Sequence, residues 1–201
     1  MSKKRVSLTL EESLVDRIDS EADKKGLNRS QMMEEVAKSY FSERGIDTAV
    51  VLCGDPGTRS LELYEGKPVL EHILEHLEGQ GVSRAVLLVG RNGEIEERFG
   101  YSHGSLVLDY VDEEEPRGTA AALSEVEDLV DSTFAVLNGH VITDVDLDEM
   151  HGVHREEDTV ATMALTTVED PSGYGVARLK GSRILGFEEK PEEGEEPSRL
   201  I

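Results

Sequence analysis

The stretch Ala49-Val50-Val51-Leu52-Cys53-Gly54-Asp55-Pro56-Gly57-Thr58-Arg59 decides the fold. An apolar run bounded by turn residues is typical of a strand that is covered on both faces in a parallel sheet. The glycines Gly54 and Gly57 let backbone N–H groups approach a phosphate closely, and Arg59 adds a fixed fork of donors. Many turns between a strand and a helix carry two glycines, so an ordinary turn and a phosphate-binding loop both stay open at this point.

Strand and helix patterns alternate after this stretch. Apolar runs predict strands at residues 85–89, 106–111, 134–137, 159–167 and 174–177, the last pairing with 184–187, and helical patterns fall near 69–77, 95–99 and 119–123. The alternation predicts an α/β fold, with a Rossmann-like, mostly parallel mixed sheet flanked by helices. Ligands bind such sheets at the carboxyl ends of the strands. We therefore expect the Gly54–Arg59 loop, the Gly118-Thr119 turn and the Asn138-Gly139-His140 turn to converge.

The first 45 residues follow a different pattern. Residues 5–10 alternate strictly between polar and apolar side chains, which predicts a strand with Val6, Leu8 and Leu10 on one side. A first helix follows, and Gly26 suits its end. Asn28 caps a second helix at the spacing of a capping box. One strand and two short helices bury too little apolar surface alone, and the lone strand has two unpaired edges, so we expect a homodimer in which two strands pair antiparallel.

Residues 3–44, with this order of strand, helix, Gly26-Leu27-Asn28-Arg29-Ser30 and second helix, resemble the ribbon-helix-helix DNA-binding family. The resemblance implies a two-stranded ribbon in the major groove of double-stranded DNA, with Arg5, Ser7 and Thr9 reaching base edges and Lys4 beside them. It also implies that Asn28, Arg29 and Ser30 at the start of the second helix hold a phosphate with backbone N–H groups. A dimerisation module that binds no DNA is the alternative.

The charge is distributed unevenly. The chain of 201 residues has 43 acidic and 21 basic residues, a formal charge of −22. The first 45 residues hold nine of each, so the whole excess lies beyond them. Scattered acidic residues, scarce lysine and few aromatics are typical of proteins from organisms with high internal salt, and an acidic interaction surface is the alternative. A neutral module inside such an acidic chain suggests that this module meets a polyanion.

The remaining composition points to a soluble, cytoplasmic protein. No apolar run is long enough to span a bilayer, and the basic residues after Met1 lead into an alternating pattern, unlike a signal peptide. We therefore expect no membrane partner. The single cysteine, Cys53, excludes a disulfide framework and a cysteine-based metal site.

A second set of motifs runs through the rest of the chain. In order they are Gly57-Thr58-Arg59, Gly66-Lys67-Pro68-Val69-Leu70-Glu71-His72-Ile73-Leu74, Glu115-Pro116-Arg117-Gly118-Thr119-Ala120, Leu137-Asn138-Gly139, Tyr174-Gly175-Val176 and Glu189-Lys190-Pro191. Together they resemble the sugar-phosphate nucleotidylyltransferase family over roughly residues 47–201. These enzymes join a sugar 1-phosphate to a nucleoside triphosphate with magnesium and release pyrophosphate.

The resemblance also implies a site. It assigns Gly54, Gly57, Thr58 and Arg59 to the triphosphate, Gly118 and Thr119 to the base and ribose, and Glu189 and Lys190 to the sugar phosphate, with Asn138, Gly139 and Gly175 completing the motifs. The nucleotide or sugar-phosphate site implied in this way is vestigial, because the sequence departs from the family where chemistry takes place.

Four departures carry this interpretation. Asp55 replaces the second glycine of the family's loop and brings an anion to where phosphates bind. The segment with the principal catalytic lysine looks deleted between Arg59 and Gly66. His140 stands where the family has a magnesium-binding aspartate, and imidazole is a poor magnesium ligand. The pattern stops at Ile201, where the family continues with more sheet and a second metal-binding aspartate. Phosphoryl-group chemistry depends on the charge neutralisation that these parts supply.

No metal site is predicted. Asp144 offers a carboxylate near His140 but reads better as a turn residue, and His103, His151 and His154 are too loosely placed to complete a set of ligands. His151 and His154 are expected on a solvated helix.

Three hypotheses follow. In the first, residues 1–45 form a dimeric DNA-binding head and residues 47–201 a catalytically inactive domain that senses a nucleotide or sugar phosphate or aids assembly, so that the chain is a transcription regulator with no required cofactor. In the second, the chain is an active nucleotidylyltransferase with a dimerising head, and magnesium is required. In the third, the chain is an assembly factor that binds another protein.

Overall fold

The computed structural model describes residues 6–42, 45–54, 59–90, 93–113, 118–157, 159–189 and 198–201. Of the predicted site residues, Lys4, Arg5, Gly57, Thr58 and Lys190 lie outside this described part, as does Asp55. The chain divides into two compact units, residues 1–151 and 152–201. Within the first unit we call residues 6–42 the head and residues 45–151 the sheet domain.

The head contains two helices, α1 (Glu12–Lys25) and α2 (Arg29–Ser42). Gly26 ends α1 in the left-handed conformation (φ 68°), which glycine adopts at little cost. Asn28 and Gln31 form the predicted capping box: the Gln31 N–H donates to Asn28 Oδ1 at 3.0 Å, and the Asn28 N–H donates to Gln31 Oε1 at 2.9 Å. Of the side chains that the structure describes in these helices, Ile18, Ala22 and Met32 form a small buried core.

The strand predicted at the start of the head does not form in this single chain. Residues 6–11 have no regular secondary structure, and the side chains of Val6 and Leu8 are 69% and 66% exposed. A strand exists only where its backbone N–H and C=O groups find a neighbouring strand, and no described segment of the same chain supplies one. The segment at residues 6–11 therefore lacks the second strand with which it was predicted to pair in a ribbon.

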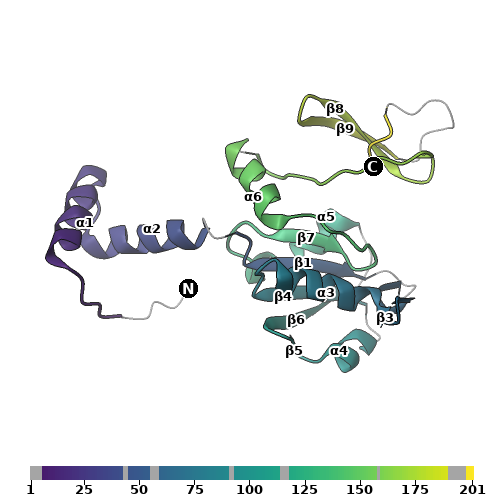
Figure 1. The fold of residues 1–201 in the computed structure, drawn as a ribbon, viewed down its shortest axis with the longest axis horizontal. Helices are drawn as coiled ribbons and strands as arrows, with labels where there is room; N and C mark the ends of the chain where they lie inside the picture. The colour runs from purple at the N-terminus through teal and green to yellow at the C-terminus, as the bar shows by residue number, and fades with distance from the viewer. Residues whose placement is uncertain are drawn as a thin grey trace. The chain divides into compact units, whose positions relative to one another are not determined.

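Five strands of the described chain form the central sheet, in the order β5-β6-β4-β1-β7 (Figure 1). The parallel strands are β1 (Thr48–Cys53), β4 (Arg84–Val89), β6 (Leu106–Asp112) and β7 (Ala135–Asn138), and β5 (Ser102–His103) pairs antiparallel to β6. A separate hairpin joins β2 (Leu63–Tyr64) to β3 (Lys67–Pro68). The predicted mostly parallel α/β architecture is confirmed.

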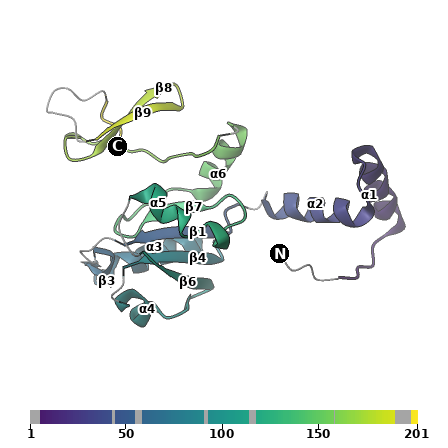
Figure 2. The ribbon, with the colours of Figure 1, turned by 180° about the vertical axis from the view of Figure 1, so that it is seen from behind.

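The alternation of side chains along β1 divides the core into two layers. Ala49, Val51 and Cys53 pack under α3 (Val69–Gly79), α4 (Glu94–Phe99) and α6 (Leu147–Glu156). Val50 faces the opposite way, toward α5 (Thr119–Ser124) and the short helix η2 (Glu127–Leu129), a layer seen from behind in Figure 2. Because both faces are covered, β1 tolerates the continuous apolar run from which it was predicted. His151 of α6 is buried, so its predicted solvated position is wrong.

The second unit contains one hairpin, formed by β8 (Gly175–Lys180) and β9 (Arg183–Glu189) as predicted. The strand predicted at Thr159–Thr167 is wrong. Among the described residues only Thr167 makes a bridge, to Leu200, and Val160 and Met163 are exposed. An apolar run alone does not make a strand, because a strand also needs a hydrogen-bonded neighbour along its length. Within the described part of the chain, no helix is both long and apolar enough to cross a membrane.

Candidate functional site

The carboxyl ends of the parallel strands share one edge of the sheet, and β1 and β7 are direct neighbours there. Leu52 pairs with Asn138, and the Gly139 N–H donates to the Leu52 carbonyl oxygen at 2.8 Å. Gly54 follows β1 directly, so the structure brings the start of the predicted phosphate loop beside the Asn138-Gly139-His140 turn. This is the edge where open parallel sheets bind their ligands.

Gly139 is the point of closest packing at this edge. A Cβ atom added there would lie 2.6 Å from Cys53 Sγ, 2.8 Å from Ser60 Oγ and 2.9 Å from the Leu52 carbonyl oxygen. Ser60 belongs to the short helix η1 (Arg59–Leu61) and is buried. Only glycine fits between β1, β7 and η1, which holds the η1 segment, and with it the backbone of Arg59, against the strand ends.

The buried thiol of Cys53 is not a reactive group. Burial raises its pKa to about 12, and a hydrogen bond with the Ser60 hydroxyl lowers it only in part. A thiol protonated to such a high pH is neither a nucleophile nor a metal ligand at neutral pH. Cys53 therefore contributes packing at the site.

Glu113 was not among the predicted site residues, yet its carboxylate lies against Gly54. A Cβ atom at Gly54 would collide with Glu113 Oε2, and the Glu113 N–H donates to the Val89 carbonyl oxygen at 2.9 Å just beyond β6. The signal in the sequence was the acidic run Asp112-Glu113-Glu114-Glu115 at the end of a predicted strand. An anion beside the loop works against phosphate binding, in the same sense as Asp55.

The donors at the end of β7 do not fit magnesium. His140 supplies an imidazole, and its Nδ1 is buried without a hydrogen-bond partner among the described residues. Magnesium requires oxygen ligands in near-octahedral geometry, which a ring nitrogen does not provide. Asp144 is exposed. Within the described part of the chain, no group of three or more His, Cys, Asp or Glu side chains could hold a metal ion.

The remaining predicted ligand residues divide between the two units. In the first, Gly118 (φ 91°) starts the six-residue helix α5, and its carbonyl oxygen accepts the N–H groups of Ala121 and Ala122 at 3.0 Å, with Thr119 exposed beside it. In the second, Gly175 pairs with Glu189 across the hairpin, and a Cβ at Gly175 would lie 3.0 Å from Glu189 Oε2. The Glu189 carboxylate can therefore pack over residue 175 because glycine has no side chain there.

The head presents its predicted DNA-binding residues at the surface. Ser7, Thr9 and Ser30 are exposed. Arg29, in contrast, is held by Asp19 of α1: Arg29 Nε and Nη2 donate to the two carboxylate oxygens at 2.6 and 2.5 Å. These charge-assisted bonds lower the pKa of the Asp19 carboxyl. The guanidinium therefore ties α2 to α1, and the predicted phosphate site at this helix start would depend on the backbone N–H groups.

Two family models match the chain. The model described as nucleotidyl transferase matches residues 49–200, and the ribbon-helix-helix model of the copG family matches residues 4–41. The chain belongs to the nucleotidyl transferase family. Its head is a ribbon-helix-helix domain, so both predicted resemblances are confirmed.

Curated relatives and solved structures agree with this family. The bifunctional protein GlmU of Methanococcus maripaludis is 32% identical over 164 residues, which cover 76% of this chain and 38% of that protein. D-glycero-alpha-D-manno-heptose 1-phosphate guanylyltransferase of Campylobacter jejuni is 30% identical over 154 residues, 71% of this chain and 68% of that protein. The chain thus spans less than half the length of several of the curated relatives it matches.

Among solved structures, HddC from Yersinia pseudotuberculosis superimposes with a TM-score of 0.65 at 22% identity, covering 78% of this chain and 73% of the other. This likeness concerns the fold. The part of this chain that HddC covers is about as long as the nucleotidyl transferase domain, residues 49–200.

Proposed function

We propose that the chain is a dimeric, sequence-specific DNA-binding transcription regulator, with residues 1–45 as its reading head and residues 47–201 as a catalytically inactive sensing or assembly domain. The observation that carries the proposal is the ribbon-helix-helix head, whose exposed Val6 and Leu8 form the apolar side of an alternating segment that has no partner strand among the described residues.

The dimer reads DNA through the other side of this segment. When two copies pair, Val6 and Leu8 turn onto the joined helices, and Arg5, Ser7 and Thr9 project from the ribbon into the major groove. Arginine reads guanine with two parallel hydrogen bonds, each such pair discriminating by about 1–3 kcal/mol. Because the Asn28 N–H donates to Gln31, phosphates rest on the N–H groups of Arg29 and Ser30, and Lys4 adds charge beside the ribbon.

The second part of the proposal is that the nucleotidyl transferase domain does no chemistry. Glu113 and Asp55 bring negative charge to the phosphate loop, the lysine segment after Arg59 is missing, and the donors at His140 do not fit magnesium. Transfer of a nucleotidyl group depends on cations that neutralise the phosphates. In this proposal the domain turns over no substrate and requires no cofactor, and it either senses a nucleotide, a sugar phosphate or a protein partner or only aids assembly.

Selection from a genomic DNA library, followed by a mobility shift in low and high potassium chloride, tests this function. Wild-type protein is expected to retain a defined sequence, and Arg5→Ala to lose at least tenfold in affinity for it while keeping its non-specific binding. If the wild-type protein retains no sequence above background, the proposal fails.

The alternative function is an active nucleotidyltransferase, which the relatives named as sugar 1-phosphate guanylyltransferases support. Arg59, Glu189 and Lys190 are retained from the family's motifs. Pyrophosphate release is measured over a panel of sugar 1-phosphates and nucleoside triphosphates with magnesium. Turnover that disappears in Arg59→Ala would establish this activity, and no turnover with any pair would reject it.

A further inference from the structure

The β8–β9 hairpin stands out by charge in this acidic chain. No Asp or Glu occurs from Pro171 to Phe187, the longest stretch without an acidic residue in the sequence. The next longest, residues 79–93, contains the buried strand β4, where charge is excluded by burial. The hairpin is largely exposed, so burial does not explain why acidic residues are absent from it up to Phe187 and occur only at its end, as Glu188 and Glu189.

Three basic residues lie on one face of this hairpin. Arg178 and Lys180 are two positions apart on β8. The register shift between Arg178 and Leu179 leaves Leu185 of β9 without a paired residue but does not interrupt β8, so both side chains share a face, and Arg183 pairs directly with Lys180 across the strands. The opposite face carries Ala177, opposite Phe187. We call Arg178, Lys180 and Arg183 the basic face.

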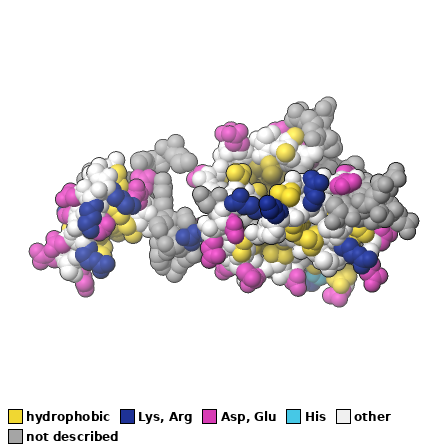
Figure 3. Space-filling model, turned by 90° about the horizontal axis from the view of Figure 1, so that it is seen from above, with side chains coloured by type: hydrophobic (Ala, Val, Ile, Leu, Met, Phe, Trp, Pro, Cys, Tyr) yellow, Lys and Arg dark blue, Asp and Glu magenta, His cyan; other side chains and the backbone are white. Residues whose placement is uncertain are grey.

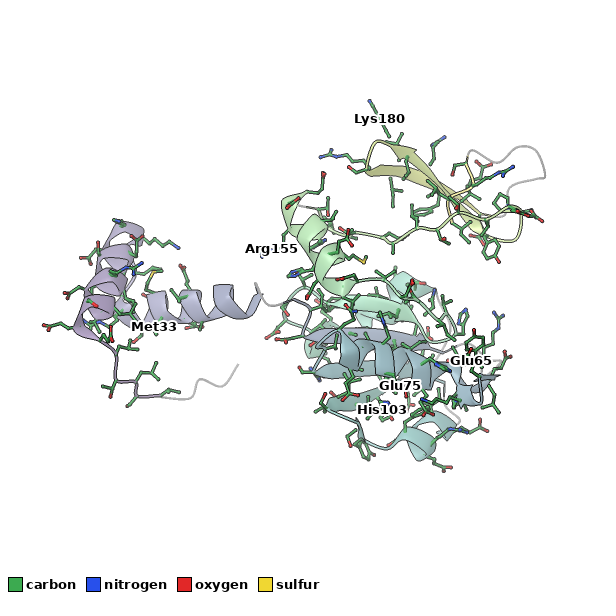
Figure 4. All side chains as sticks on the ribbon, viewed as in Figure 1. Met33, Glu65, Glu75, His103, Arg155 and Lys180 are labelled. Atoms are coloured by element: carbon green, nitrogen blue, oxygen red, sulfur yellow. The ribbon has the colours of Figure 1, made fainter. Side chains whose placement is uncertain are left out.

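The side chains of the basic face point into solvent. All three are exposed, and Lys180 extends away from the end of the hairpin (Figure 4). The view from above shows Lys and Arg side chains gathered on the face of the molecule that it presents (Figure 3). The basic face sits at the turn of the hairpin, at the other end of the strands from the Gly175–Glu189 pair. It is therefore separate from the predicted sugar-phosphate residues.

Glu188 pairs with Val176 and so lies on the same side of the hairpin, but no ion pair joins it to the basic face in the described structure. Other cations of the chain are paired: Lys67 Nζ lies 2.5 Å from Glu75 Oε1, and Arg84 Nε lies 2.6 Å from Asp109 Oδ2. In the described structure the three hairpin cations make no such pair, and the Arg178 guanidinium instead extends over Gly186. Three like charges on adjacent strands repel one another unless an anion lies across them.

We propose that Arg178, Lys180 and Arg183 bind the phosphate backbone of the DNA that flanks the sequence read by the head. The inference rests on the proposed function, because the head is what brings DNA to the second unit. Once the head is bound, the flanking duplex is present at a high effective concentration, and a few phosphate contacts suffice to hold it. Residues 46–201 carry the whole excess of acidic residues and repel DNA, whereas the charge of the described basic face suits it.

The experiment compares the wild type with the variant Arg178→Gln/Lys180→Gln/Arg183→Gln on two duplexes. The short duplex contains the selected sequence alone, and the long duplex adds flanks on both sides. We expect equal affinities of the two proteins for the short duplex. For the long duplex, the triple variant should bind about tenfold more weakly, and the slope of log Kobs against log salt should fall by about 0.9 for each phosphate that the variant leaves unneutralised.

The matched control is Lys67→Gln/Arg98→Gln/Arg155→Gln, which removes the same charge from other positions and should leave the preference for the long duplex unchanged. If wild-type protein binds DNA and the hairpin variant keeps the wild-type slope on the long duplex, the inference is wrong while the proposed function stands. An equal loss in the control variant would also overturn it. Wild-type protein that binds neither duplex would overturn both.

Discussion

The head and the sheet domain bury their apolar residues to very different extents. The sheet domain covers both faces of its central strands, and Val50, Val51, Leu70 and Leu87 are fully buried within one chain. Among its described side chains the head buries three, those of Ile18, Ala22 and Met32, and leaves Val6 and Leu8 exposed. The sheet domain thus forms its core within one chain, whereas we propose that a second copy completes the core of the head. In the proposed function the two sites differ in the opposite sense, with an intact DNA-reading motif in the head and an inactive site in the sheet domain.

The largest effect that separates the two regions should come from Leu8→Asp. If two copies pair through the ribbon, this change places a charge in the dimer core and removes two leucines from it. At about 2 kcal/mol for each leucine, the dimer should weaken by about 4 kcal/mol, or about a thousandfold in Kd. Sedimentation equilibrium measures the dimer, and a mobility shift measures the accompanying loss of DNA binding.

Leu63→Asp is the matched control for this change. Leu63 lies in the β2–β3 hairpin, outside the head, and its side chain is 68% exposed, close to the 66% of Leu8. The substitution Leu63→Asp therefore adds the same charge at an equally exposed leucine. The control should remain dimeric. A Leu8→Asp protein that sediments as the wild type does would contradict ribbon pairing.

The next effect concerns the sheet domain alone. Gly139→Ala pushes a methyl group against Cys53, Ser60 and the Leu52 backbone, which cannot all move, so we expect a loss of about 1–3 kcal/mol in the free energy of unfolding. At Gly54 the added Cβ meets only the end of the flexible Glu113 side chain. Gly54→Ala should therefore cost less than about 0.5 kcal/mol. Urea denaturation measures the free energy of unfolding of both variants. Equal losses for Gly139→Ala and Gly54→Ala would contradict the packing described at Gly139.

Much of the fold could be predicted because its strands carry local signals. The continuous apolar run of β1 and the capping box at Asn28 are readable from neighbours in the sequence, and both are present. The two-residue strands β2, β3 and β5 are too short to show a period. The alternating segment at residues 5–10 and the apolar run at 159–167 show the limit of local patterns, which indicate a strand but do not report whether a partner strand exists.

The site was less predictable, because its decisive contacts join distant residues. Sequence placed Gly54 and Gly139 at one edge, but it did not show that Glu113 lies against Gly54 or that Gly139 packs on Ser60. The Asp19–Arg29 pair joins two helices and has no spacing rule that would reveal it. Motifs with fixed chain order predicted the family, whereas the charge balance at the loop depends on the tertiary structure.

A smaller effect should come from Asn28→Ala in the head. This change removes the side-chain oxygen that accepts the Gln31 N–H, and an N-cap of this kind contributes about 1 kcal/mol. Thermal unfolding of the dimer at fixed concentration measures the loss. Ser13→Ala is the control, because Ser13 lies in the first turn of α1, where no side-chain cap is present. If both variants unfold at the wild-type temperature, the capping box does not stabilise the head.

The smallest effect is the pH dependence of the Asp19–Arg29 pair. Arg29 lowers the pKa of Asp19 in the folded head, so the pair stabilises the head above the unfolded-state pKa of Asp19, and this contribution is lost as the pH falls through the folded-state pKa. The pair is exposed, so the contribution is small and screened by salt. Titration of the Asp19 carboxyl by NMR should show its pKa rising to the ordinary range in Arg29→Ala. Glu75, whose pKa is lowered by Lys67 in the sheet domain, should titrate unchanged in that variant, because each pair acts locally. If the Asp19 pKa does not respond to the loss of Arg29, the two helices are not joined by this pair, and Arg29 would be free to bind a phosphate.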